Sequence, residues 1–129
     1  MPLSPTILDH ASSPANRRTM KDPSAIGRAN LGGRPPEVAI FLKVEGGVIK
    51  EASFEAHGCG YTIACCSVLT ELIVEKSVEY CLRLESGDVC AELGELPRER
   101  QFCATLALEA LQDALRNLVS PHVSQGEKS

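Results

Sequence analysis

The feature that most constrains the fold is a change in the period of the apolar residues near residue 58. Before it, apolar and polar side chains alternate over residues 38–44 and again over residues 48–56, as on half-buried strands. On the second of these strands one face is predicted to carry Val48, Ala52, Phe54 and Ala56, and the polar face Glu51, Ser53, Glu55 and His57. The Glu-Gly-Gly segment at residues 45–47 favours a hairpin between them. After residue 60, apolar residues recur every three or four positions, as on a helix. Strands followed by helices predict an α+β fold: a small antiparallel sheet of about three strands, with helices packed on one face.

Capping residues predict where the helices begin. Ser4, followed by proline, suits the N-cap of a short helix over residues 4–11. Thr62 is the predicted N-cap of the helix that follows residue 60. Ser77 is the predicted cap of a short helix, and another short helix is expected at residues 86–93.

The rest of the chain is predicted as loop, a final helix and a tail. Residues 12–36 are rich in Ser, Pro, Gly and Asn and are predicted as loop, with a short strand near residues 28–31. We expect a single domain over residues 1–118 and a disordered tail over residues 119–129. The final helix is amphipathic, and its apolar stripe is formed by Leu108, Leu111, Leu115 and Leu118.

Charge and composition argue against several classes of protein. Residues 1–36 carry a net charge of +3 and residues 37–129 one of −7, and an acidic body argues against nucleic-acid binding. No apolar run reaches the ~20 residues of a membrane span, so no membrane partner is expected. The start of the chain lacks the pattern of a signal peptide. We therefore expect a cytoplasmic protein whose six cysteines are thiols or metal ligands rather than disulfides.

Cys59 stands between two glycines, where the second strand ends and a helix begins. Backbone N–H groups and the helix dipole at such a position favour a thiolate over a thiol. Flanking glycines remove side-chain bulk around the sulfur. This pattern is typical of a reactive or metal-binding thiolate. The alternative is a cysteine that merely occupies a glycine turn.

The remaining candidates for the same site are Cys103 and His57. Cys103 lies near the start of the final helix, so it meets Cys59 if both helix starts lie at one edge of the sheet. His57 lies two residues before Cys59 and is a candidate metal ligand, although a surface histidine on a polar strand face is the plainer interpretation. The other cysteines lie in predicted helices and are interpreted as packing residues: Cys65, Cys66, Cys81 and Cys90.

Three stretches of the chain together resemble one family. They are "ILDHASSPAN" at residues 7–16, "GVIKEASFEAHGCGYTIACCSVLTEL" at residues 47–72 and "LPRERQFCATLALEALQDAL" at residues 96–115. They resemble the opening helix, the central strand with its Gly-Cys-Gly turn, and the final helix of the NifU-like, IscU-type scaffold proteins of iron–sulfur cluster assembly. The resemblance covers about residues 7–118 and implies a SufE/NifU-like fold.

The resemblance also implies a metal site. In that family three cysteines, an aspartate and a histidine surround an open site for iron or a [2Fe–2S] cluster, and thiolates of this kind suit zinc as well. Cys59 matches the second family cysteine and Cys103 the third. The third is the usual acceptor of sulfur that a cysteine desulfurase delivers as a persulfide, so Cys103 is the predicted catalytic residue. His57 is the predicted third metal ligand beside the two cysteines.

This sequence departs from the family at the other ligands. Arg34 or Pro35 stands where the first cysteine is expected, Pro36 or Glu37 replaces the aspartate, and Phe102 replaces the histidine. One hypothesis is that His57 and Glu37 compensate as ligands. Another is that Arg34 holds a persulfide or sulfide by its charge.

The predicted function is therefore an iron–sulfur cluster assembly scaffold or carrier, not an enzyme. The implied partners are a cysteine desulfurase and the apo-proteins that receive the cluster, and the sequence is compatible with a homodimer. Two alternatives stay open: a SufE-like persulfide acceptor that needs no metal, and a ligand-depleted paralogue that only regulates the desulfurase. No paired carboxylates, nucleophile-elbow serine or Gly-rich phosphate loop indicates another activity.

Overall fold

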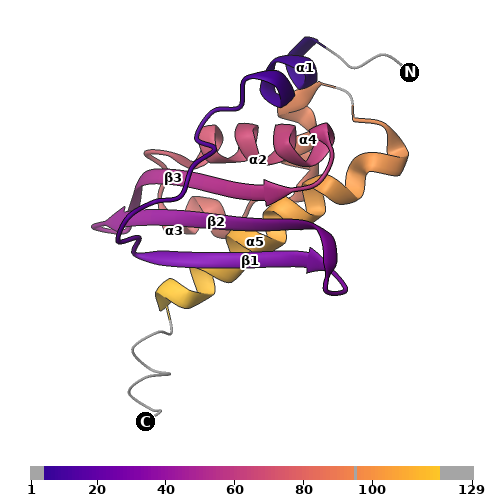
Figure 1. The fold of residues 1–129 in the computed structure, drawn as a ribbon. Helices are drawn as coiled ribbons and strands as arrows, with labels where there is room; N and C mark the ends of the chain where they lie inside the picture. Colours follow the sequence, from indigo (N-terminus) through magenta and orange to yellow (C-terminus); the bar gives the residue numbers. More distant parts are fainter. Residues whose placement is uncertain (1–4, 95, 120–129) are drawn as a thin grey trace.

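A three-stranded antiparallel sheet forms the centre of the molecule, and the longer helices pack on one of its faces (Figure 1). The computed structural model describes residues 5–94 and 96–119. The predicted α+β class is confirmed. The strands, in the order β1-β2-β3, are β1 (Ala25–Leu31), β2 (Arg34–Glu45) and β3 (Val48–His57). The helices are α1 (Pro5–Ser12), α2 (Gly60–Ile73), α3 (Val78–Leu82), α4 (Ser86–Leu93), the 3-10 helix η1 (Arg98–Arg100) and α5 (Gln101–Val119).

The predicted hairpin joins β2 to β3, with one irregularity in its register. Gly46 and Gly47 both have positive φ angles, which is why glycine suits this turn. Val44 pairs with Ile49 while Lys43 pairs with Glu51, so the residue between them on β3 forms a bulge. The bulge changes which side chain faces the helices. Ile49 is fully buried there, whereas the sequence pattern had placed Val48 on that face.

The other face of the sheet is partly covered by the segment that follows α1. Arg17 pairs with Phe54 in a β-bridge at the free edge of β3, and Met20 is buried. Arg18 contacts Glu51 at 3.8 Å, and Thr19 donates a hydrogen bond to Glu55 at 3.2 Å. Ser53, predicted on the polar face of β3, is fully buried opposite Phe41. The prediction of an exposed Ser53 was wrong because alternation within one strand does not reveal a distant segment that crosses its outer face.

β1 and β2 both begin earlier than predicted. β1 begins at Ala25 rather than near residue 28, and β2 begins at Arg34 within the predicted loop. The register shifts between Asn30 and Leu31, so the two prolines that follow Arg34 fall outside the regular pairing. Proline is tolerated there because its missing N–H is not needed by the ladder.

The core lies between the sheet and the helices α2, α4 and α5. The predicted stripe on α5 is buried at Leu111 and Leu115, and Ser77 caps α3 by accepting a hydrogen bond from the N–H of Tyr80 at 3.0 Å. All six cysteines are free. Cys65, Cys66 and Cys81 are fully buried, as the packing interpretation predicted, and Cys90 packs partly exposed against the core.

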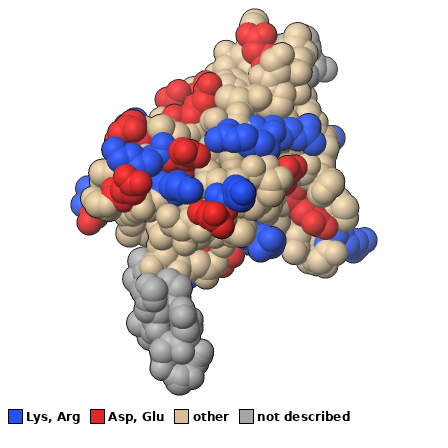
Figure 2. Space-filling model, turned by 60° about the vertical axis from the view of Figure 1, so that its left-hand side comes forward, with Lys and Arg blue, Asp and Glu red and all other residues tan. Residues whose placement is uncertain are grey.

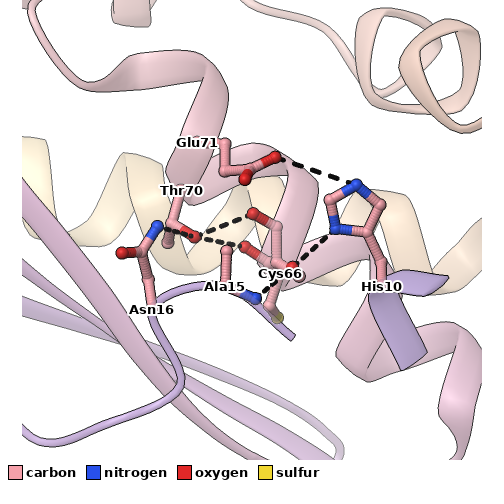
Figure 3. Close-up of polar contacts among 7 residues, drawn as sticks. His10, Ala15, Asn16, Cys66, Thr70 and Glu71 are labelled. Atoms are coloured by element: carbon pink, nitrogen blue, oxygen red, sulfur yellow. Dashed lines mark hydrogen bonds and ion pairs between the residues drawn. The ribbon is translucent and has the colours of Figure 1, made fainter. Parts of the chain in front are cut away.

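A polar network fastens the start of the chain to α2 (Figure 3). His10 Nδ1 lies 2.7 Å from Ser67 Oγ, and the backbone N–H of Ala15 donates to the same oxygen at 2.8 Å. Asn16 donates to Thr70 Oγ1 at 3.2 Å. Because Ser67 and Thr70 are fully buried, these hydrogen bonds are shielded from water and hold α1 beside α2. The predicted cap of α1, Ser4, lies outside the described residues.

Charges of both signs share the face seen in Figure 2, where acidic side chains lie above and below a short basic band. Lys50 and Glu75 form an ion pair at 3.5 Å, and Arg18 and Glu51 one at 3.8 Å. Among the described residues, no helix is long and apolar enough to cross a membrane. The predicted tail falls mostly on residues 120–129, which lie outside the described part of the chain.

Candidate functional site

Cys59 is the N-cap of α2 and so stands directly before the first turn of that helix. Its backbone is extended, with φ −81° and ψ 175°, and its carbonyl accepts a hydrogen bond from the N–H of Ile63 at 3.2 Å. The prediction of Thr62 as N-cap was wrong, because the helix begins at Gly60. Thr62 instead lies in the first turn, three residues after the cysteine, where its side chain turns back toward the helix start.

Thr62 joins Cys59 to Cys103. Its hydroxyl donates to Cys103 Sγ at 3.4 Å and lies 3.8 Å from Cys59 Sγ. Since both sulfurs contact one oxygen atom, they cannot lie further apart than these two distances together. The predicted meeting of Cys59 and Cys103 at two helix starts is confirmed, because Cys103 lies in the first turn of α5.

Arg100 completes the group from the last residue of η1. Its Nη1 donates to Cys59 Sγ at 3.9 Å. Its guanidinium lies over the ring of Tyr61, 5.4 Å from the ring centroid, in a cation–π contact. Tyr61 therefore supports a positive charge beside the sulfur of Cys59. We refer to Cys59, Thr62, Arg100 and Cys103 as the thiol cluster.

The environment moves the pKa values of the two thiols in opposite directions. Partial burial would raise the pKa of Cys59, and it is opposed first by hydrogen bonds from the backbone and side chain of Thr62. The backbone N–H of Tyr61 and the charge of Arg100 add to this, and the pKa of Cys59 is lowered. Burial raises the pKa of Cys103, and the adjacent charge of Cys59 raises it further, against the hydrogen bond from Thr62. Of the two thiols, Cys59 therefore ionises at the lower pH.

Cys59 is expected to react with iodoacetamide faster than Cys90, which is a matched control because both are partly exposed. Burial raises the pKa of Cys90, so at pH 7 it has a smaller thiolate fraction than Cys59. We expect a rate difference of about tenfold, narrowing as the pH is raised past the pKa of Cys59 toward that of Cys90, where both thiols become thiolates. Time-resolved peptide mass spectrometry of the reduced protein measures both rates. Equal labelling, or faster labelling of Cys90, would contradict this assignment.

His57 and Glu37 lie together, but apart from the thiol cluster. They are direct partners across β2 and β3, both are exposed, and both line a hollow of about 170 Å³ on the outer face of the sheet. Within residues 5–94 and 96–119, no three His, Cys, Asp or Glu side chains are grouped so that they could hold one metal ion. The structure thus does not bring His57 to Cys59 and Cys103. Successive strand residues face opposite sides, and His57 follows the buried Ala56.

The other positions of the expected ligand set also hold no ligand. Arg34 is exposed at the start of β2, and Phe102 is 37% exposed. The side chain of Pro36 lies beside Gly58, in the space next to Thr62. Within the described residues, the expected ligand positions therefore contribute two sulfur donors to the thiol cluster, Cys59 and Cys103.

Sequence reasoning missed Thr62 and Arg100 as members of this cluster. A signal for each was present, because Thr62 follows Cys59 by three residues and Arg100 precedes Cys103 by three. In helical segments this spacing places two side chains on the same face. The signal could not be used without knowing at which residue each helical segment begins.

The comparisons with known proteins agree on one family. The family model of the NifU-like N terminal domain matches residues 3–123. The iron-sulfur cluster assembly scaffold protein IscU of Aquifex aeolicus is 34% identical over 113 residues, covering 86% of this chain and 72% of that protein. The IscU scaffold protein of Haemophilus influenzae is 30% identical, covering 89% of this chain and 94% of that protein.

A solved structure shares the fold of this chain. The crystal structure of a nitrogen-fixing NifU-like protein (N-terminal) from Brucella abortus superimposes with a TM-score of 0.72 at 17% identity, covering 90% of this chain and 93% of that one. The matched region contains both cysteines of the thiol cluster. The chain therefore belongs to the family of the NifU-like N terminal domain.

Proposed function

We propose that this chain is an iron–sulfur cluster assembly scaffold that holds iron or a [2Fe–2S] cluster at Cys59 and Cys103. The observation that carries the proposal is the shared contact of both sulfurs with Thr62. Thiolates are the ligands that iron in clusters requires, and the two sulfurs come from separate helix starts that the fold brings together. The family relatives bear the same function in their names.

The thiol cluster supplies fewer ligands than iron or a [2Fe–2S] cluster requires. Iron in a [2Fe–2S] cluster and structural zinc each take four ligands, whereas the thiol cluster supplies two cysteine sulfurs, which lose their protons when metal binds. Bridging sulfide and thiols of partner molecules fill the other positions. A site of this kind releases its cargo readily, which suits a carrier rather than an enzyme. Sulfur arrives from a cysteine desulfurase and the product passes to apo-proteins, in the cytoplasm, where thiols stay reduced.

Anaerobic iron loading tests this proposal. The reduced protein is supplied with ferrous iron and sulfide, and bound iron and thiolate-to-iron absorption are measured. We expect Cys59→Ser and Cys103→Ser each to remove most of the bound iron. Cys90→Ser is the matched control and is expected to bind as the unaltered protein does, because Cys90 lies outside the thiol cluster. Unchanged iron in both cluster variants would refute the proposal.

The SufE-like alternative has one observation in its favour, the partly exposed Cys59 with its lowered pKa. A persulfide acceptor needs one such thiolate and no metal. The iron measurement separates the two functions, because a pure acceptor binds no stoichiometric iron at any of these positions.

A further inference from the structure

The two cysteines of the thiol cluster differ in their access to another molecule. Cys103 has no exposed surface, whereas Cys59 is partly exposed between two exposed glycines. The family resemblance assigns sulfur acceptance to Cys103. From the geometry we propose instead that Cys59 accepts the incoming sulfur and that Arg100 positions the transferred atom. This inference rests on the proposed function and names the residue that performs its first step.

Access decides between the two thiols because the sulfur donor is itself bound to another protein. A thiolate must approach the terminal sulfur of the donor persulfide along the S–S bond. Cys103 Sγ lies beneath Thr62 within the core, so this approach would require the start of α5 to open. Cys59 is partly exposed at the surface of the protein. Neither Gly58 nor Gly60 has a side chain that could obstruct the donor.

The transfer is balanced without any oxidant or reductant. The Cys59 thiolate attacks the terminal sulfur of the donor persulfide and forms a new Sγ–S bond. The S–S bond of the donor breaks, and the donor cysteine leaves as a thiolate. Cys59 then carries the persulfide with the proton or, after ionisation, a negative charge on its terminal sulfur.

Arg100 is placed to hold that terminal sulfur. Its Nη1 lies 3.9 Å from Cys59 Sγ, and a persulfide extends one S–S bond, about 2.05 Å, beyond Sγ. The contact with Tyr61 limits the movement of the guanidinium. A fixed cation beside a small anion orients it, so Arg100 acts as a positioning residue for the persulfide.

The site of sulfur acceptance can be mapped directly. The reduced protein is treated anaerobically with glutathione persulfide and then alkylated, and peptide mass spectrometry finds which cysteine carries the extra sulfur. We expect the label on Cys59, retained in Cys103→Ser and lost in Cys59→Ser. A label on Cys103 or Cys90, or none on any cysteine, would overturn the inference.

The role of Arg100 has its own matched control in the same 3-10 helix. Arg100→Gln is expected to slow persulfide formation on Cys59 about tenfold, as for loss of one charged hydrogen bond. Arg100→Lys restores most of the rate, and Arg98→Gln, at an exposed position, stays within about twofold. Equal rates in all three variants would show that Arg100 does not position the sulfur.

Iron loading of the same preparations separates this inference from the proposed function. Normal iron binding with sulfur on Cys103 overturns the inference alone. Sulfur on Cys59 in a protein that binds no iron supports the inference and refutes the scaffold function.

Discussion

Replacement of Gly27 by alanine is expected to lower the free energy of unfolding by about 3 kcal/mol or more. Gly27 lies in β1 where α5 crosses it most closely. A Cβ atom there would come within 2.1 Å of the carbonyl oxygen of Ala110 and of the backbone nitrogen of Ala114. Both are backbone atoms of a long helix, so no side-chain rotation relieves the overlap, and the helix must move away from the sheet.

Two hydrogen bonds show why the helix cannot move freely. Asp113 accepts one from the backbone N–H of Arg28 at 2.9 Å, and Asn117 donates one to the carbonyl of Ile26 at 2.7 Å. These bonds hold α5 on β1 on both sides of Gly27. Displacement of the helix would lengthen them and would open the core beneath Leu111 and Leu115.

Gly87 provides the matched control for this prediction. It lies in the first turn of α4, and a Cβ atom there would meet nothing within 4 Å. Gly87→Ala is expected to be neutral or to stabilise the protein by about 0.5 kcal/mol, because alanine favours a helix over glycine. Urea unfolding followed by circular dichroism compares the variants. If Gly27→Ala unfolds at the same urea concentration as Gly87→Ala, the close approach of α5 to β1 is wrong.

The same glycine explains which parts of the fold the sequence could not predict. Alternation and helical periodicity identified β2, β3, α2 and α5, because one face of each of these elements is apolar. β1 carries small and polar residues, and its beginning was missed. The start of β1 pairs with β2 and packs at Gly27 against α5, a helix more than 80 residues away in the chain, and neither contact can be seen in the local sequence.

Some residues of the candidate site could be predicted from the sequence and others could not. The meeting of Cys59 and Cys103 could be predicted because Cys59 directly precedes one helix and Cys103 lies near the start of another. The role of Thr62 could not, because its position in the first turn depends on where α2 begins. The grouping of His57 with Cys59 was predicted because alternation in a strand places residues 57 and 59 on the same side, but β3 ends at His57 and Cys59 is the N-cap of α2. In the structure the side chain of His57 lies on the outer face of β3, opposite Glu37.

The two glycines beside Cys59 look equivalent in sequence, but the structure distinguishes them. A Cβ atom on Gly58 would come within 2.9 Å of Thr62 Oγ1 and 2.8 Å of the Cβ of Pro36. A Cβ atom on Gly60 would meet only the Cβ of Ala11, at 3.4 Å, which is ordinary contact. Thr62 is fully buried, so it has no free space into which to retreat from a side chain at position 58.

Gly58→Ala is therefore expected to displace the Thr62 hydroxyl that joins the two sulfurs. We expect iron affinity to fall at least about tenfold, as when a group that orients metal ligands is lost, while Gly60→Ala stays within about twofold. Anaerobic iron titration measures both variants, and circular dichroism confirms that each remains folded. The rate of Cys59 alkylation should fall in Gly58→Ala as well, because the thiolate loses a hydrogen bond from Thr62. If the two variants bind iron equally well, the Thr62 bridge does not organise the site, and the two thiols must be held together by the packing of α2 against α5 alone.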